Sequence, residues 1–118
     1  MAPLQQRSPD GFLTLVVSHD EEGVTIGFQG QAWHTHGDIL AASYPFGKTQ
    51  GLAAGTAAKC FVDDVLANRV VIVVQRICGQ VRDIWVTSDI DGELRYKAQD
   101  ETLEFRYWDG RAARPSAG

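Results

Sequence analysis

The chain has 118 residues, of which 44% are hydrophobic and 22% charged. These proportions are those of globular domains and exclude a disordered, collagen-like or coiled-coil chain. Fifteen acidic residues against eleven basic ones give a net charge of −4 at pH 7. Nucleic acids and anionic membranes are bound through basic surfaces, so this charge argues against both as partners. The length suffices for one domain with its own core.

The sequence pattern predicts a chain without a targeting signal. Its first residues lack the apolar segment of a signal peptide, and no apolar run has the length of a membrane-spanning helix. Cys60 and Cys78 are too few for a disulfide scaffold, and both lie among apolar neighbours, which predicts buried or half-buried free thiols. We therefore expect a cytoplasmic protein without a bound cofactor.

The two ends of the chain are unpatterned. Residues 1–11 contain two prolines, a glycine and several polar residues, and 109–118 are rich in alanine, arginine, glycine and proline. Neither segment shows a helical or strand period. We therefore expect flexible tails on either side of a single domain over 12–108.

The patterned region begins with two strands. Residues 12–18 are rich in strand-forming types, and 24–28 alternate, with Val24, Ile26 and Phe28 on one side. The turn-like residues between the two segments predict a β-hairpin with one face in the core.

A helix is predicted over 56–68, because apolar residues recur there at helical spacing. Thr56 is its expected N-cap, and Asn68 suits its C-terminal end. Every residue of 70–74 is apolar, which predicts a strand buried on both faces. A turn at 89–93 is expected to join two of the later strands. These further strands are predicted at 81–87, 94–96 and 102–108.

Together the elements predict an α+β domain. Its sheet is predominantly antiparallel, with five to six strands and one main helix in the order ββαββ(β)β. A single helix covers only one face of such a sheet. On the second face we expect Trp85, Trp108 and valines of 70–74, a composition found where proteins meet partners. Alternatively, the segment 30–55 covers this face.

Residues 33–38 bring together three side chains of metal-binding types. In an extended segment His34, His36 and Asp38 project from the same side. A catalytic zinc site needs three such ligands and one open position. Because no HExxH or CxxC motif accompanies them, hydrogen bonding at a recognition surface is the preferred interpretation. A metal-dependent enzyme is the alternative.

Four segments carry a family resemblance. A strand runs into an aromatic-His-x-His segment over 24–38, and a helix and strand follow over 61–73. A tryptophan-bearing strand at 84–86 and an aromatic-basic strand at 105–108 complete the pattern. In these features the chain resembles small bacterial α+β proteins that include immunity-type proteins of polymorphic toxin systems. The resemblance implies a noncatalytic protein that binds and blocks a toxin through Trp33, His34, His36 and Asp38.

We therefore expect a protein-binding domain whose partner is another protein, either a toxin or a second copy of this chain. The surface that meets a more basic partner is expected to be acidic and aromatic. It comprises Trp33, His34, His36, Asp38, Asp63, Asp64, Trp85 and Trp108. A homodimeric structural subunit, which hides the second sheet face between two copies, is a further alternative.

Overall fold

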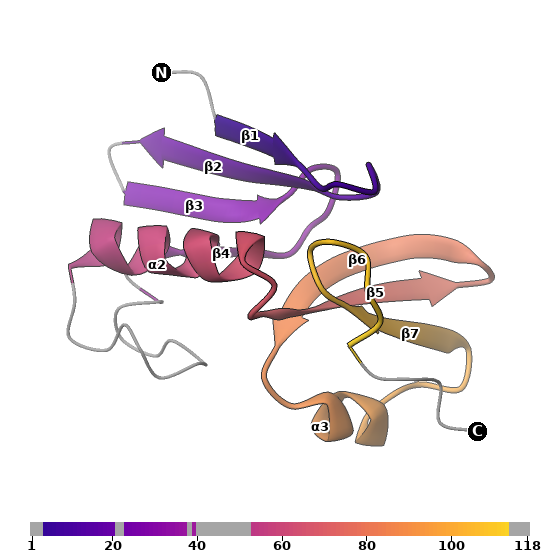
Figure 1. Ribbon diagram of the computed structural model, residues 1–118. Helices are drawn as coiled ribbons and strands as arrows, with labels where there is room; N and C mark the ends of the chain where they lie inside the picture. Colours follow the sequence, from indigo (N-terminus) through magenta and orange to yellow (C-terminus); the bar gives the residue numbers. More distant parts are fainter. Residues whose placement is uncertain (1–3, 21–22, 38, 40–52, 114–118) are drawn as a thin grey trace.

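The computed structural model describes residues 4–20, 23–37, 39 and 53–113 (Figure 1). Asp38 and most of the segment 30–55 that was expected as an alternative cover lie outside these residues. The elements in chain order are β1 (Leu4–Arg7), β2 (Thr14–Asp20), β3 (Gly23–Phe28), β4 (His34–His36), α2 (Ala54–Leu66), β5 (Val71–Ile77), β6 (Gln80–Thr87), α3 (Ile90–Arg95) and β7 (Glu101–Arg106).

The strands form two antiparallel sheets (Figure 1). The four-stranded sheet has the order β1-β2-β3-β4, and the three-stranded sheet has the order β6-β5-β7. The α+β class is confirmed, but a single sheet of five to six strands with one helix, in the order ββαββ(β)β, is wrong. Hydrophobic alternation identifies a strand but does not show which strands pair with each other. The pattern therefore could not reveal that the strands divide between two sheets.

Two of the strands lack the pattern that would reveal them. All four residues of β1 are exposed, and β4 has only three residues. Residues 4–7 pair with β2 where the sequence predicts a flexible lead-in, with Leu4 opposite Val17 and Arg7 opposite Thr14. Backbone pairing with β2 therefore contributes most to holding β1 in place, because its side chains bury little surface.

Helix α2 lies against the inner face of the four-stranded sheet (Figure 1). Its N-cap is Ala53, which makes no side-chain cap, so Thr56 lies inside the first turn rather than capping it. Asn68 ends the helix as predicted, with a positive φ of 62°. The amide of Asn68 donates to Val65 O at 3.2 Å and that of Arg69 to Asp64 O at 2.9 Å, which is the Schellman pattern.

The segment predicted as a turn followed by a strand is helix α3. The Asp89 side chain accepts a hydrogen bond from the Gly92 amide at 3.0 Å and so caps the helix. Asp91 and Glu93 in the first turn and Arg95 in the last favour the helix dipole. The predicted strand at 94–96 is therefore wrong, because an N-cap and charges of the right sign outweigh a short aliphatic-aromatic pattern.

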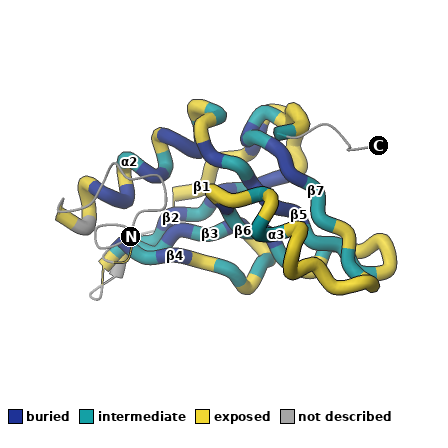
Figure 2. The backbone as a smooth tube through the Cα atoms, turned by 90° about the horizontal axis from the view of Figure 1, so that it is seen from below, coloured by how far each residue is buried: buried dark blue, intermediate teal, exposed yellow. Residues whose placement is uncertain are grey.

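Side chains from α2 and both sheets form one hydrophobic core, and Figure 2 shows the buried segments concentrated in α2 and the central strands. Burying each large aliphatic or aromatic side chain contributes about 1.5–3 kcal/mol. The members of this core are Leu13, Leu15, Val17, Ile26, Phe28, Ala57, Ala58, Phe61, Val65, Val70, Ile72, Val74, Ile84 and Trp108.

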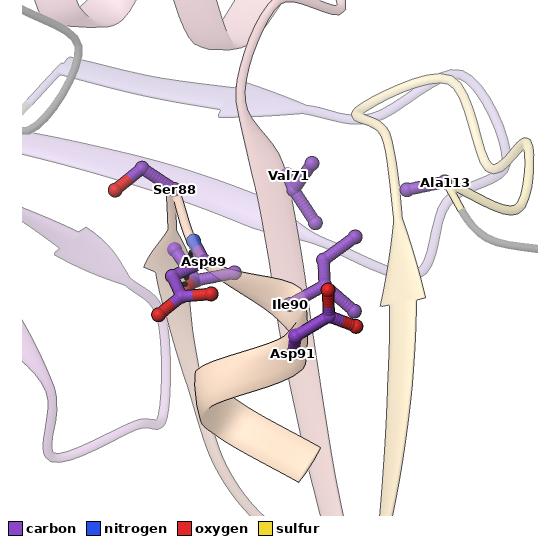
Figure 3. A pocket seen from close by; sticks show the side chains of 7 residues that line it. Val71, Ser88, Asp89, Ile90, Asp91 and Ala113 are labelled. Carbon is purple, nitrogen blue, oxygen red and sulfur yellow. Dashed lines mark hydrogen bonds between the residues drawn. The ribbon is translucent and has the colours of Figure 1, made fainter. Parts of the chain in front are cut away.

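Helix α3 lies over part of the opposite face of the three-stranded sheet. Val73 on this face is fully buried, and Trp85 donates from Nε1 to Glu93 Oε1 of α3 at 3.2 Å. Val71, Ile90 and neighbouring residues line an open hollow of about 470 Å³ beside the helix (Figure 3). This face is thus partly covered from within the same chain.

An ion pair ties the turn after β1 to β7. Asp10 receives hydrogen bonds from Arg106 at 2.8 and 3.1 Å and from the Ser8 hydroxyl at 2.6 Å. Arg106 is 3% exposed, and its guanidinium lies 5.3 Å from the centre of the Phe12 ring. The Arg106 and Ser8 hydrogen bonds hold the pKa of Asp10 well below its usual range.

The residues after β7 are also structured up to 113, in part of the predicted C-terminal tail. The Asp109 amide donates to Asn68 Oδ1 at 3.0 Å, and the Ala113 amide donates to Phe105 O at 2.9 Å. Residues 107–113 therefore form a turn that packs back on β7.

The two cysteines differ in exposure. Cys60 is half-buried as predicted, whereas Cys78 is exposed. Cys78 and Gly79 form the two-residue turn between β5 and β6, with φ of 53° and 77°. Positive φ at both positions is typical of a type I′ turn, which places Cys78 at a hairpin tip away from the core. Among the described helices, none is both long and apolar enough to cross a membrane.

Candidate functional site

The outer face of the four-stranded sheet is the face turned away from α2. Strand alternation sends Leu15 and Val17 into the core and the intervening Val16 to this outer face. The strand register aligns Gln5, Val16, Gly27 and His34 in one row, and Ser18, Thr25 and His36 in the next. No described helix or strand lies over the outer face (Figure 1).

The histidines of β4 both project from this face. Thr35 between them is buried, whereas His34 is exposed and His36 half-buried. The two imidazole rings are in edge-to-face contact, with 5.0 Å between their centroids. The extended conformation expected for this segment thus places both histidines on one side.

Hydrogen bonds fix how the two imidazoles present their nitrogens. Nδ1 of His34 lies 3.1 Å from the Ala32 carbonyl oxygen. Because a carbonyl only accepts, the neutral ring carries its proton on Nδ1 and leaves a lone pair on Nε2. Nε2 of His34 is therefore the ring nitrogen without a hydrogen bond to the described residues. In His36, Nδ1 likewise lies 3.1 Å from the Thr25 hydroxyl.

A glycine lets β4 lie close to β3. A Cβ at Gly27 would lie 3.0 Å from the Trp33 carbonyl oxygen and 3.3 Å from His34 Cβ. Its missing side chain also helps to form a hollow of about 390 Å³ on the outer face. Neutral polar and aromatic residues line most of this hollow, including Gln5, Ser18, Thr25, Gln31, Trp33 and His34.

Replacing Gly27 with alanine is expected to displace β4. The new methyl group is too close to a backbone oxygen, and crowding of this kind costs about 1–3 kcal/mol. We expect a loss of about 1 kcal/mol in urea unfolding, because alanine also restricts the unfolded chain, together with amide shift changes concentrated in 33–36. Gly55→Ala is the control, since nothing lies within 4 Å of its added Cβ. Unchanged amide shifts in β4 would contradict the prediction.

Trp33 lies where the two sheets meet. Its ring stacks on Phe28, with 6.0 Å between centroids and 27° between planes. Its backbone amide donates to Asp83 Oδ1 of β6 at 3.1 Å. Trp33 therefore holds the beginning of β4 against the three-stranded sheet while also lining the hollow.

The structure brings together three of the eight predicted partner-binding residues, namely Trp33, His34 and His36. Asp38 lies outside the described residues. Asp63 is exposed on α2, whereas Asp64 is 6% exposed and pairs with Arg69 at 2.8 Å. The two remaining residues, Trp85 beside α3 and Trp108 in the core, lie away from β4.

Trp108 differs most from its expected place. It is 4% exposed and packs in the core, whereas the sequence predicts it beside Trp85 on the second sheet face. In the register of β5 and β7, Arg106 pairs with Ile72 of the core face, whereas Phe105 pairs with Val73 on the face of Trp85. The even-numbered side of β7 therefore turns toward the core, the reverse of the predicted facing, and Trp108 follows on that side. In this conformation Trp108 presents almost no surface to a partner.

Several residues of the hollow carry no signal of their own in the sequence. Thr25 and Gly27 fall on the outer side of the predicted hairpin by alternation alone. Gln5 belongs to β1, whose exposed side chains show no period. Neutral glutamine, serine and threonine are common on solvated strands, so only the three-dimensional register identifies this group as a site.

Two of the three side chains proposed for a metal-dependent enzyme lie together on β4. Asp38, the third, lies outside the described residues. Within the described part of the chain, no group of three or more His, Cys, Asp or Glu side chains is placed to hold a metal ion.

Fold and site define an α+β protein of two antiparallel sheets, one of which has a largely neutral face that no described helix or strand covers. No protein-family model, curated protein or solved structure matches the chain. Function is therefore inferred from the residues and their geometry.

Proposed function

We propose that the protein is a noncatalytic protein-binding domain that uses the outer face of the four-stranded sheet. The observation that carries this proposal is the hollow over Gly27, which combines Trp33 and His34 with hydrogen-bonding side chains on a face without a described cover. Aromatic side chains within a polar surround are typical of protein interfaces. The sheet is a firm base for such a surface, because its inner face is anchored in the core.

The proposed partner is a toxin that is blocked by binding. The sequence resemblance to immunity-type proteins supports this choice, as does the net charge of −4, which favours a basic partner. In this proposal the imidazole ring of His34 contacts the toxin, and the side-chain amides of Gln5 and Gln31 form hydrogen bonds with it. The overall negative charge speeds association with a basic partner.

The experiment pairs the protein with the candidate toxin encoded beside its gene. We expect a stable complex, and growth of cells that express both proteins. Ser18→Arg places a bulky cation on the outer face and is expected to weaken the measured affinity at least about tenfold. Ser88→Arg is the matched control, because Ser88 is exposed beside α3, away from the hollow.

Two results would overturn the proposal. Absence of both complex and protection would exclude this toxin as the partner. Equal affinities of the Ser18→Arg and Ser88→Arg variants would place the interface elsewhere. Circular dichroism spectra of both variants establish that each is folded.

A further inference from the structure

The two histidines of β4 have the spacing of a metal chelate. Zinc binds imidazole nitrogen at about 2.0–2.1 Å with tetrahedral angles, so two rings on one ion have centroids about 5 Å apart. The rings of His34 and His36 are 5.0 Å apart. Their centroid separation therefore equals that of two imidazole rings on a shared ion.

The hydrogen bonds of both rings resemble those of metal-bound histidines. Such residues generally use the second ring nitrogen in a bond that fixes the orientation of the ring. Here Nδ1 of His34 is held by the Ala32 carbonyl, and Nδ1 of His36 by the Thr25 hydroxyl. Nε2 of each ring is then the nitrogen left for an ion, and neutral imidazole selects Zn²⁺, Ni²⁺ or Cu²⁺ over Mg²⁺ and Ca²⁺.

This pair supplies only half of a tetrahedral set. Among the described residues, no third His, Cys, Asp or Glu side chain joins the two histidines. Among the described strands, β4 is also an edge of the four-stranded sheet, paired with β3 on one side. An edge strand is a template for pairing with another chain.

A second copy completes the set by symmetry. If two β4 strands pair antiparallel about Thr35, His34 of each copy lies opposite His36 of the other, and all four imidazoles share one sheet face. Neutral ligands leave the ion its full positive charge. That charge offsets the repulsion between two chains that each carry a net charge of −4.

We propose that His34 and His36 form half of a transition-metal site, and that Zn²⁺ joins two copies of the chain along β4. This proposal does not depend on the toxin-binding function. It treats the second copy as the occupant of the β4 edge, because the ligand set is incomplete without it.

The proposal is tested by sedimentation velocity of the full chain in two buffers, one with added ZnCl₂ and one with EDTA. Both buffers contain a phosphine reductant. We expect a monomer in EDTA and a dimer at one Zn²⁺ per two chains, with the ratio measured by elemental analysis. His34→Ala and His36→Ala should each weaken dimer formation at least about tenfold. Thr25→Val, which removes the hydroxyl beside His36, should weaken it about tenfold as well.

His19→Ala is the matched control, because His19 is an exposed histidine on β2 that lies outside the pair. It should dimerise with Zn²⁺ like the parent chain. A monomer at every Zn²⁺ concentration, one bound ion per monomeric chain, or a dimer that survives both histidine substitutions would each overturn the proposal. Toxin binding measured in EDTA reports separately on the proposed function.

Discussion

Replacing Asp10 with alanine is expected to lower the free energy of unfolding by about 3 kcal/mol. Removing one partner of a buried ion pair typically costs 3–5 kcal/mol, because the other charge is left without compensation. Arg106 is that remaining charge, and its side chain is only 4% exposed. Asp10 itself is 36% exposed, which places the expected loss at the lower end of this range.

The measurement is urea unfolding at pH 7, with Arg111→Ala as the control. Arg111 also pairs with an aspartate, Asp109 at 2.9 Å, but it is 67% exposed. Its replacement is expected to cost less than about 1 kcal/mol. Equal losses in the two variants would show that burial of Arg106 does not set the strength of the Asp10 pair.

The same ion pair predicts a dependence of stability on pH. The folded-state pKa of Asp10 lies below its value of about 4 in an unfolded chain, because Arg106 and then Ser8 donate hydrogen bonds to the carboxylate. The stabilisation is therefore complete at pH 7 and is lost progressively as the pH falls below about 4. The stability difference between the parent chain and Asp10→Ala should narrow from about pH 4 down to pH 2. A constant difference would show that the Asp10 carboxylate does not supply this stabilisation.

Replacing Trp108 with alanine is expected to lower the free energy of unfolding by about 3–5 kcal/mol. Trp108 is 4% exposed in the core cluster, and its removal leaves a cavity among packed side chains. Its carbonyl oxygen also accepts a hydrogen bond from Arg106 at 3.2 Å, so the residue adjoins the Asp10 ion pair. Thermal and urea unfolding measure the loss.

Trp85→Ala is the comparison that shows whether Trp108 acts in the core or at the surface. Trp85 is half-buried and hydrogen-bonded to Glu93, so we expect a loss of only about 1–2 kcal/mol. If Trp108→Ala instead leaves stability unchanged and weakens partner binding, Trp108 belongs to the recognition surface that the sequence predicts.

Local sequence patterns predicted the elements with strong periodicity. The β2–β3 hairpin is present with Leu15 opposite Phe28, and α2 ends close to Asn68 as expected. The apolar run at 70–74 lies within or beside β5, a central strand. Each of these segments combines propensity with a regular apolar spacing, so the local and tertiary preferences agree.

The remaining features depend on contacts between distant residues. β1 is held by pairing with β2. Helix α3 is held by its Asp89 cap, its charged residues and the hydrogen bond from Trp85 to Glu93. The candidate site also depends on distant contacts. His34 and His36 share a short motif, whereas Gln5 and Thr25 join them only through the register of β1, β2, β3 and β4. No spacing along the chain encodes that proximity.

The division into two sheets also has a consequence for how the chain folds. Every pairing in the four-stranded sheet joins strands that are consecutive along the chain, and in the three-stranded sheet only β5 and β7 pair across intervening elements. Short loops close at small entropic cost, and topologies rich in local contacts fold faster than those that need distant pairings. The first sheet is thus able to assemble early, leaving the closure of β7 onto β5 as the step with the longest search.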